Sequence, residues 1–495
     1  MSLIKLLNRY REGAANTREQ GDYFERLVRI WLESAPTQAG QFSRVMSYGD
    51  WAHEQGQVRT DSGIDLVAQL ADEPDNWVAI QCKFYAHGHR IQKPDLDTFI
   101  SASARRPFTR RMFIDTTGVD WGRNAIETAD QLDVPIQRIG LLDLEESGID
   151  WTAYSETGKV TITKKTPRPD QLEAIEAVVE GLKDADRGKL IMACGTGKTF
   201  TALQIAQDVA GRGGRVLFLV PSLALMSQTI REWSIDSTIA LRSFAVCSDV
   251  QVGVRKANAD DMADMDVNHL EIPATTNGSR LAAKANRPDR ERMTVVFSTY
   301  QSIEAVFEAQ TLFDLPEFDL IICDEAHRTT GATLAGEDES NFVRIHNADY
   351  VSGRKRLYMT ATPRVFGEQV QRAAEEGAAT LASMDDEATY GKTLFTRNFG
   401  WAVQNGLLTD YKVIVLAVDE DSIARGIQSL LADKTNELDL DDATRMVGCY
   451  KALTKFDFRP DVATDTGVMH RALMFAKSIK SSELIRDQFA AVARK

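Results

Sequence analysis

A carboxylate, an amide and an ammonium group are predicted to meet in the stretch GIDLVAQLADEPDNWVAIQCK, which spans residues 63–83. The stretch has the pattern of two short strands joined by an acidic turn that contains proline. Because side chains alternate along a strand, Gln81 and Lys83 project from one face of the second strand. Pairing with the first strand would bring Asp65 beside them, and the helical segment that precedes them adds Glu25.

The residue types in this set suit metal-assisted hydrolysis of a phosphodiester. Asp65 and Gln81 carry oxygen ligands of the kind that Mg²⁺ prefers. Lys83 could help to activate the attacking water or neutralise the charge of the pentavalent transition state. The strand alone is equally consistent with an edge strand whose lysine reaches out to water. The nuclease interpretation therefore draws on Asp65 and Glu25 in addition to the strand.

A phosphate-binding loop is predicted at residues 192–199, MACGTGKT, which follow an apolar strand and precede a helix. Its glycines let backbone N–H groups close around an anion, its lysine would reach the terminal phosphates, and its last threonine would ligate Mg²⁺. ATP and Mg²⁺ are therefore the expected cofactors. The residues assigned to ATP binding in this loop are Gly195, Thr196, Gly197, Lys198 and Thr199, the last also as a metal ligand.

A second acidic motif, LIICDEAH at residues 320–327, complements the loop. Its apolar strand delivers Asp324 and Glu325 to the C-terminal tip. Asp324 would hold Mg²⁺ next to ATP, and Glu325 would orient and polarise the attacking water. Alone, the motif reads as an ordinary acidic loop after a core strand. Together with the phosphate-binding loop it indicates ATP hydrolysis.

Two patterns of secondary structure position these residues. Residues 17–34 have apolar residues at helical spacing, and strand-like segments follow up to about residue 150, which predicts a compact α/β unit. From Asp170 onward, apolar strands alternate with helices, as in a parallel sheet covered on both faces. Residues 249–292 are polar and irregular, so we expect an insertion or loop there. The strand-like segments of the first unit are 44–48, 63–70, 77–84, 111–115 and 135–139.

Composition excludes several classes of protein. The chain has 495 residues, too many for one core, and its net charge of −14 confines any nucleic-acid site to a local basic patch. SARRPFTRR at residues 103–111 fits a DNA-backbone patch and a solvated basic face equally well. The five cysteines have neither CxxC nor zinc spacing, which suits a reducing cytoplasm. The N-terminus is too charged for a signal peptide, and no apolar stretch approaches the ~20 residues of a membrane span.

The second pattern resembles the superfamily 2 helicases and translocases of the DEAH-box type. RPDQ (168–171) is similar to the adenine-reading Q motif, LVPSLALMSQT (219–229) to motif Ia, FSTYQS (297–302) to the next strand-contacting motif, TAT (360–362) to motif III, and RALMFAKSIKSS (471–482) to motif IV. Motifs V and VI, with an arginine that reaches the γ-phosphate, are not found before Lys495. We therefore expect an incomplete second lobe and impaired translocation.

This resemblance implies roles for individual residues outside the phosphate-binding loop. Contact with the nucleic-acid backbone, without reading bases, is what a translocase needs in order to move along any sequence. The residues that the resemblance assigns are Arg168 and Gln171 for ATP, Ser222, Thr299 and Gln301 for the nucleic-acid backbone, and His327, Thr360, Ala361 and Thr362 for coupling hydrolysis to strand movement.

Residues 17–145 resemble the PD-(D/E)xK nucleases, most closely the Mrr-like branch, in which Gln replaces the second acidic residue. GID stands here in place of PD, and RRMFIDTTGVDWGRNAIETA adds to the match. The resemblance implies that Glu25, Asp65, Gln81 and Lys83 are catalytic, with Asp65 and Gln81 as metal ligands.

A nuclease of this kind ahead of such a motor resembles the N-terminal part of the type I single-polypeptide restriction–modification enzymes. This implies an ATP-dependent DNA translocase coupled to a Mg²⁺-dependent endonuclease, acting on double-stranded DNA in defence against foreign DNA. Methyltransferase and target-recognition parts are expected on domains or subunits outside this chain, and no membrane is expected. The expected parts are a restriction-endonuclease-like α/β domain (1–148), a linker (149–165), a RecA-like parallel α/β motor lobe (166–405) and an incomplete second RecA-like lobe (406–495).

Two alternatives stay open. One is a modification-dependent Mrr-type nuclease with its own helicase motor. The other is a DNA-binding defence or repair module whose nuclease fold no longer cuts. Plasmid nicking with Mg²⁺ by the wild type, Asp65→Ala and Lys83→Ala discriminates the second alternative from an active nuclease.

Overall fold

The structure is a computed structural model that divides into two compact units. Residues 1–255 with 263–408 form the first unit, and residues 256–262 with 409–495 form the second. The residues that the structure describes are 3–56, 63–247, 270–333, 340–367 and 380–411, with scattered residues between 449 and 490. All the elements discussed below belong to the first unit, and no helix among the described residues is long and apolar enough to cross a membrane.

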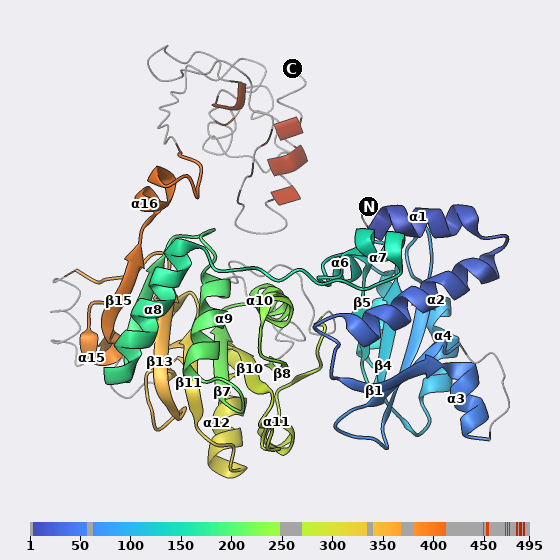
Figure 1. Cartoon of the computed structure of the whole chain (residues 1–495), viewed down its shortest axis with the longest axis horizontal. Coiled ribbons are helices and arrows are strands. Elements are labelled where there is room, and N and C mark those ends of the chain that lie inside the picture. Colours follow the sequence, from blue (N-terminus) through green and yellow to red (C-terminus); the bar gives the residue numbers. More distant parts are fainter. Residues whose placement is uncertain are drawn as a thin grey trace, which may run out of the picture. The chain divides into compact units, whose positions relative to one another are not determined.

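A five-stranded mixed sheet forms the N-terminal domain, in the order β1-β2-β3-β4-β5 (Figure 1). β2 is antiparallel to both of its neighbours, β1 and β3, whereas β3, β4 and β5 run parallel. The strands lie close to the segments predicted from the sequence. Their bounds are Phe42–Ser47 for β1, Leu66–Leu70 for β2, Trp77–Lys83 for β3, Phe108–Asp115 for β4 and Ile136–Ile139 for β5.

Helices cover both faces of this sheet. One core forms where α1 (Leu3–Gly13), α2 (Thr17–Ser34) and α7 (Trp151–Thr157) pack on the first face. The other core lies under α3 (Tyr48–Glu54), α4 (Lys93–Ser103) and α5 (Arg123–Asp130). α2 begins after Asn16, whose side chain accepts from the backbone N–H of Glu19, and it buries Phe24, Leu27 and Trp31. Its bounds are those that the apolar spacing predicts.

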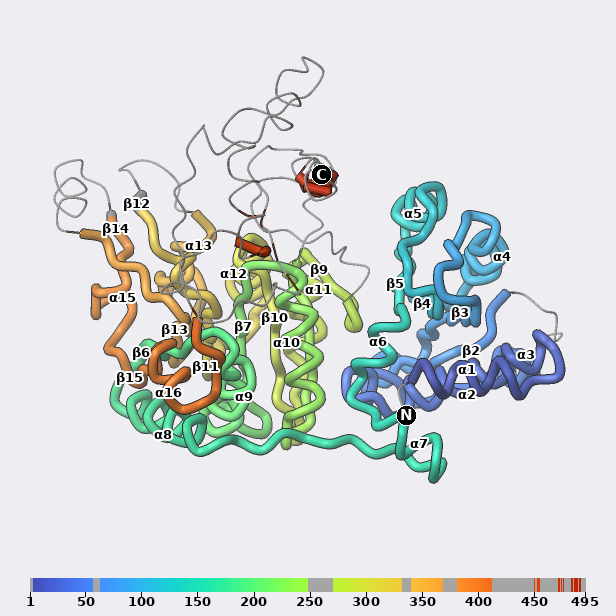
Figure 2. The backbone as a smooth tube through the Cα atoms, turned by 90° about the horizontal axis from the view of Figure 1, so that it is seen from above, coloured from blue at the N-terminus to red at the C-terminus, as the bar shows by residue number. Residues whose placement is uncertain are grey.

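The segment after this domain differs from the predicted linker, because it begins as a helix. α6 (Leu141–Glu145) is followed by α7, and the Trp151 indole is buried in the first core with its Nε1 donating to the carbonyl of Leu144 at 2.8 Å. Residues 159–168 are then mostly without regular structure and lead to the second domain (Figure 2). A single tryptophan that packs back onto the sheet gives no periodic signal, so the sequence could not reveal this helix.

The second domain is built on an eight-stranded parallel sheet in the order β15-β6-β13-β11-β7-β10-β8-β9. Its apolar strands alternate with helices along the chain, as predicted. The strands are β6 (Arg187–Met192), β7 (Arg215–Val220), β8 (Leu241–Val246), β9 (Ala274–Thr275), β10 (Met293–Thr299), β11 (Phe318–Cys323), β13 (Gly353–Thr360) and β15 (Lys392–Arg397).

Helices pack on both faces of the second sheet as well. α8 (Pro169–Asp184), α9 (Lys198–Val209) and α10 (Leu223–Asp236) cover one core, and α11 (Gly278–Ala285) and α12 (Ile303–Leu312) cover the other (Figure 1). Of the expected insertion, residues 248–269 lie outside the described residues, but residues 270–292 are structured as β9 and α11. Short elements complete the domain: η2 (Tyr300–Ser302), η3 (Ala326–Thr329), β12 (Gly331–Thr333), α13 (Asn341–Arg344), β14 (Thr380–Ala382), α15 (Glu387–Tyr390) and α16 (Phe399–Gln404).

The expected second lobe falls largely outside the described residues. This applies to TDYKVIVLAV beyond Tyr411 and to most of the motif IV candidate at 471–482. The incomplete second lobe therefore stays a prediction, as do the exact domain bounds.

His346 is a buried structural residue of the second domain. Its Nδ1 lies 2.9 Å from the Tyr358 hydroxyl and its Nε2 lies 3.1 Å from the carbonyl oxygen of Thr329. Burial lowers the pKa of His346 to about 4, because the charged imidazolium would lose its hydration. The imidazole is therefore neutral at neutral pH.

We expect this histidine to make folding sensitive to mild acid. Between pH 6.5 and about 4 the unfolded chain takes up a proton that the folded chain refuses, so stability present above pH 6.5 is lost as pH falls. At pH 5 the loss is about 2 kcal/mol for a shift of this size. Urea unfolding of wild type and His346→Gln at pH 7.5 and pH 5 should show the difference between them shrinking by about that amount.

The matched control is His53→Gln, because His53 lies exposed on α3. A stability difference between wild type and His346→Gln that is the same at pH 7.5 and pH 5 would contradict the assignment.

Candidate active sites

The phosphate-binding loop joins β6 to α9 and depends on two glycines with left-handed backbones. Gly195 has φ of 78° and Gly197 has φ of 85°, values that favour glycine. A Cβ added at Gly197 would lie 2.5 Å from Nε2 of Gln171. The loop therefore keeps its backbone N–H groups at the N-terminus of α9, where an anion is stabilised by the helix dipole.

The predicted Q motif lies directly against this loop. Arg168 Nη2 and Gln171 Nε2 both donate to the carbonyl of Thr196, at 2.7 and 3.2 Å. Gln171 Oε1 accepts from the backbone N–H of Arg168 at 3.0 Å, which closes the capping box of α8. Both atoms of the Gln171 amide are thus engaged within the protein, and the side chain is buried.

The acidic pair at the end of β11 faces the loop lysine. Glu325 Oε1 lies 4.0 Å from Lys198 Nζ, and Glu325 itself has a left-handed backbone with φ of 48°. Burial, with the charge of Glu325 next in size, raises the pKa of Asp324 to about 6. A buried carboxylate of this kind is stabilised by a cation, and Lys198 and Thr199 at the start of α9 are residue types that a Mg²⁺–triphosphate requires.

A hydrogen bond connects the acidic motif to the predicted motif III. His327 Nδ1 lies 3.1 Å from Thr360 Oγ1 and 3.3 Å from Glu325 Oε2. Thr360 Oγ1 also accepts from the backbone N–H of Thr362 at 3.2 Å across Ala361, which fixes the turn after β13. The chain of contacts from Lys198 to Thr362 runs through Glu325 and His327.

The three residues assigned to the nucleic-acid backbone share one edge of the sheet. Thr299 pairs with Val220 at the C-terminal ends of β10 and β7, and Ser222 caps α10 just beyond. Gln301 Nε2 lies 3.5 Å from the carbonyl of Pro221. Thr299 is buried with 6% exposure, so it is less accessible than Ser222 and Gln301. The buried Gln301 Oε1 has no hydrogen-bond partner among the described residues.

In the first domain, strand register brings Asp65 to the end of β3. Leu66 pairs with Ile80, so Asp65 lies opposite Gln81, and Asp65 Oδ2 accepts from the backbone N–H of Cys82 at 2.6 Å. In the parallel direction Lys83 pairs with Asp115 at the end of β4. The register therefore places Asp65, Gln81 and Lys83 at the same end of β3.

The side chain of Gln81 has the properties of a metal ligand. Its side chain is 4% exposed, and its Oε1 has no hydrogen-bond partner among the described residues. An unpaired buried acceptor costs free energy unless a ligand satisfies it. Together with the Asp65 carboxylate it forms an oxygen donor set that fits Mg²⁺. The described residues contain no cluster of three or more His, Cys, Asp or Glu side chains placed for a metal.

Glu25 approaches from the opposite face of the sheet. Cys82 and Phe84 point toward α2, and the Phe24 and Phe84 rings stack with centroids 5.1 Å apart. Desolvation raises the pKa of the Cys82 thiol well above its usual value, and the Asp65 and Glu25 carboxylates raise it further, whereas Lys83 lowers it. Glu25 thus lies near this end of β3, on the side to which Cys82 points.

Sequence reasoning missed Arg11, which holds α1 against the same end of the sheet. Its Nη2 donates to the carbonyl of Tyr85 at 2.9 Å, and its guanidinium lies over the Phe84 ring at 4.4 Å. Only tertiary packing brings α1 to β3, so no spacing in the sequence signals this residue.

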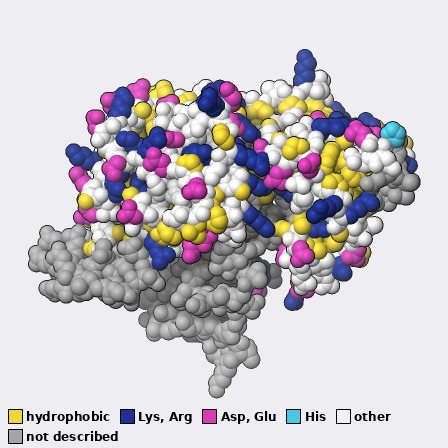
Figure 3. All heavy atoms as spheres, turned by 90° about the horizontal axis from the view of Figure 1, so that it is seen from below, with side chains coloured by type: hydrophobic (Ala, Val, Ile, Leu, Met, Phe, Trp, Pro, Cys, Tyr) yellow, Lys and Arg dark blue, Asp and Glu magenta, His cyan; other side chains and the backbone are white. Residues whose placement is uncertain are grey.

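The basic stretch at residues 103–111 does not form one patch. Arg111 is buried and donates to Ser103 Oγ at 2.8 Å and to the carbonyl of Val134 at 2.6 Å. Arg105 donates to the Tyr48 hydroxyl at 2.5 Å, and Arg110 lines a cavity toward the second domain. These arginines are therefore largely committed to structure. Figure 3 shows Lys and Arg side chains interspersed with Asp and Glu over the described surface, with several basic side chains gathered where the two domains meet.

Two family models match successive parts of the chain. Residues 33–161 match the family model of a restriction endonuclease, and residues 164–365 match that of the type III restriction enzyme, res subunit. The chain thus joins a restriction-endonuclease domain to a helicase-type ATPase domain of restriction enzymes. These matches confirm the predicted pair of domains and the predicted fold class.

Two individual relatives are a helicase and a restriction endonuclease subunit, by their names. The chain is 28% identical over 273 residues to "Probable helicase A859L" of African swine fever virus (isolate Pig/Kenya/KEN-50/1950), covering 55% of this chain and 26% of that protein. It is 26% identical over 285 residues to the "Type I restriction enzyme EcoAI endonuclease subunit" of Escherichia coli, covering 55% of this chain and 28% of the relative.

A solved structure is similar over nearly the whole chain. It is the "ATP-dependent Type ISP restriction-modification enzyme LlaBIII bound to DNA", with a TM-score of 0.77 and 34% identity over 99% of this chain and 31% of that one. The chain spans about a quarter to a third of the length of these relatives.

Gly197→Ala should weaken ATP binding about tenfold or more. The added Cβ brings left-handed strain of about 1–2 kcal/mol and displaces the Gln171 amide that it would meet at 2.5 Å. Titration with a fluorescent ATP analogue measures the effect. Gly158→Ala is the control, because Gly158 has φ of 70° but no heavy atom within 4 Å of the added Cβ. Equal affinities for the two variants would show that the loop does not bind the triphosphate as described.

Proposed function

We propose that this chain is the cleavage and translocation part of a restriction enzyme, which moves along double-stranded DNA with ATP and nicks it with Mg²⁺. The observation that carries the proposal is that Asp65, Gln81 and Lys83 stand at one end of β3, with a buried Gln81 Oε1 that has no hydrogen-bond partner among the described residues, in a chain that also holds a phosphate-binding loop. Defence against foreign DNA in the cytoplasm is the corresponding biological role.

In the ATPase site, the chain's residues would bind and orient the triphosphate. Lys198 would pair with the terminal phosphates in place of its present neighbour Glu325, and Thr199 and Asp324 would hold Mg²⁺. Bound Mg²⁺ would supply charge neutralisation on the phosphate oxygens. Glu325, released from Lys198, would orient the attacking water. Arg168 and Gln171 would contact the adenine side of the nucleotide.

Coupling of hydrolysis to DNA would run through His327. Its imidazole touches both Glu325 and Thr360, so a change at the water-orienting carboxylate alters the hydrogen bonds of the 360–362 turn. Burial lowers the pKa of His327, which keeps the ring neutral and able to accept at one nitrogen while donating at the other. Ser222 and Gln301 at the same sheet edge would contact DNA phosphates, and Thr299 would support them from beneath.

In the nuclease site, Asp65 and Gln81 would hold Mg²⁺ against a scissile phosphate. The metal would supply a polarised water and a charge clamp on the phosphate oxygens. Lys83 would neutralise the charge that develops in the transition state. Glu25 lies near Cys82 on the α2 side and would influence the metal-binding end of β3 through its negative charge. The Cys82 N–H holds Asp65 in place through its 2.6 Å hydrogen bond.

The relatives provide the wider context of the proposal. One is described as a restriction-modification enzyme bound to DNA and another as an endonuclease subunit. Methyltransferase and target-recognition functions would come from domains or subunits other than those described here. A modification-dependent nuclease with the same motor remains the second candidate, because the site geometry serves either system.

Nicking of supercoiled plasmid tests the nuclease assignment. With Mg²⁺, the wild type should relax the plasmid. Asp65→Ala removes a proposed metal ligand and Lys83→Ala a proposed transition-state charge partner, and each should slow nicking about 100-fold or more. Gln81→Ala should raise the Mg²⁺ concentration needed for half-maximal nicking.

Control variants should separate chemistry from general surface charge. Asp97→Ala and Lys93→Ala remove an exposed ion pair of 3.5 Å on α4 and should nick like the wild type. Equal nicking by wild type, Asp65→Ala and Lys83→Ala would refute the cutting role and favour a DNA-binding module.

A further inference from the structure

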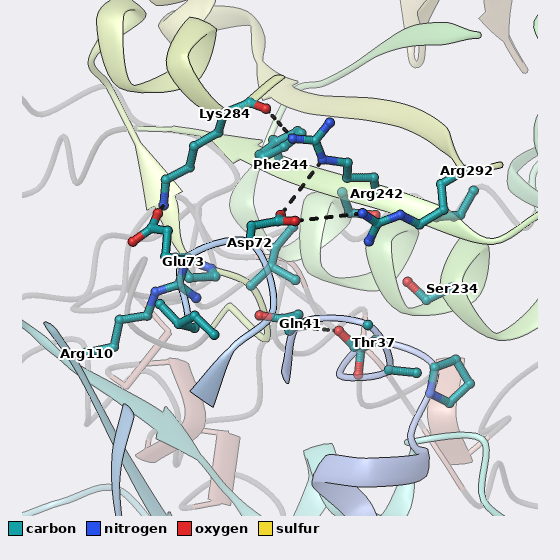
Figure 4. Close-up of a pocket in the computed structure, with 18 residues that line it drawn as sticks. Thr37, Gln41, Asp72, Glu73, Arg110, Ser234, Arg242, Phe244, Lys284 and Arg292 are labelled. Atoms are coloured by element: carbon teal, nitrogen blue, oxygen red, sulfur yellow. Dashed lines mark hydrogen bonds and ion pairs between the residues drawn. The ribbon is translucent and has the colours of Figure 1, made fainter. Parts of the chain in front are cut away.

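The turn between β2 and β3 makes ion pairs with the second domain. Asp72 lies 3.9 Å from Arg242 Nε and 3.8 Å from Arg292 Nη2, and Glu73 Oε1 lies 3.0 Å from Lys284 Nζ. Figure 4 shows both carboxylates pointing toward these basic side chains. Arg242 belongs to β8 and Lys284 to α11, so the turn contacts the body of the motor sheet and a helix packed on it.

On the motor side of this contact, Arg242 is fixed by further hydrogen bonds. Arg242 is 5% exposed and its guanidinium also donates to the carbonyls of Lys284 and Arg287, at 2.7 Å for the second. Burial acts to raise the pKa of Glu73, but hydrogen bonds from Lys284 and Asn76 outweigh it and keep the pKa below its usual value. Glu73 is therefore charged at neutral pH.

The cavity at this contact, about 120 Å³, is too small for a nucleotide, since ligand pockets are usually about 300–1,000 Å³. The charged groups that line it meet one another rather than a large ligand. Arg110 from β4 adds a further positive charge on the nuclease side, close to both carboxylates. Charge complementarity between the turn and the motor is thus the main chemistry of the contact.

Two further contacts fix the nuclease on the motor. Arg231 of α10 pairs with Asp143 at 3.0 Å and with Glu146, both in the nuclease, and with the motor's own Glu271 at 2.8 Å. The amides of Gln38 and Gln137 donate to the backbone carbonyls of residues 271 and 270, at 3.1 and 2.7 Å. Ser222, a proposed DNA contact, is the N-cap of α10, so the Arg231 contact lies on the helix that starts directly after it.

The hairpin that makes the ion pairs also carries the cutting residues. Its tip holds Asp72 and Glu73, and its other end holds Asp65, Gln81 and Lys83. A seven-residue strand such as β3 spans about 20 Å. A displacement of the tip by the motor would therefore be transmitted along two paired strands to the metal-binding end.

We propose that this hairpin couples the nuclease to the motor, so that nicking responds to the nucleotide state of the ATPase site through the ion pairs of Asp72 and Glu73. The inference rests on the proposed function for the two sites themselves. It assigns the hairpin tip a positioning role, because neither carboxylate is near the cutting residues.

Carbodiimide cross-linking tests the contact without relying on nicking. The reagent joins a carboxylate to an amine that forms an ion pair with it, so the wild type should yield a cross-link between Glu73 and Lys284, detected by peptide mass spectrometry. Glu73→Lys should lose it, and the charge-exchanged double variant Glu73→Lys with Lys284→Glu should regain it. Absence of the cross-link in the wild type would overturn the proposal at its first step.

The ratio of plasmid nicking rates with and without ATP tests the coupling in the same proteins. The wild type should nick faster with ATP. Glu73→Lys should reduce this ratio about threefold or more toward one, the scale of a partly buried ion pair, and the double variant should restore it. Glu317→Lys is the matched control, because it breaks a 2.7 Å surface ion pair with Arg354 within the motor, and it should keep the wild-type ratio.

The outcomes separate the two proposals. If the wild type does not nick under any condition, both the proposed function and the coupling are contradicted. Nicking with a wild-type ratio of one, or a ratio unchanged in Glu73→Lys, would overturn the coupling alone.

Discussion

Strand direction is the constraint on which both sites depend. Parallel neighbours end at the same edge of a sheet, so residues that are far apart in the chain meet there without long loops. In the motor domain this edge collects the phosphate-binding loop after β6, the acidic pair after β11 and the turn after β13. In the nuclease domain β3 and β4 are parallel, and the antiparallel β2 enters beside them, so that its first residues meet the last residues of β3. The chemistry of each domain follows from which side chains stand at those ends.

Short-range pattern was sufficient to predict much of this arrangement. The helix at residues 17–34 and the strand carrying Gln81 and Lys83 follow from apolar periodicity, because each buries one continuous face. The phosphate-binding loop was predictable because its glycines, lysine and threonine are adjacent in the sequence. The position of Asp65 opposite Gln81 followed once the two strands were assumed to pair.

Tertiary packing decided the features that could not be predicted. α7 depends on one buried tryptophan, and α11 lies in a stretch whose many charged residues hide its small apolar face. The side of the sheet from which Glu25 approaches depends on how α2 packs, which local spacing does not specify. Arg11, Arg231 and the partners of Asp72 and Glu73 are separated from their contacts by many residues, so only the folded chain reveals them.

The engaged amide of Gln171 has a consequence for nucleotide selection. A purine that hydrogen-bonds to the remaining amide N–H or to the remaining lone pair would meet a side chain already oriented by the Thr196 carbonyl and the Arg168 N–H. Base recognition is thereby linked to the shape of the loop that holds the phosphates, since Thr196 lies between its two glycines. A nucleotide whose base cannot make this hydrogen bond would gain no contact with the side chain that is bonded to the loop. Discrimination among bases would thus depend on the geometry of the loop as well as on the base contact itself.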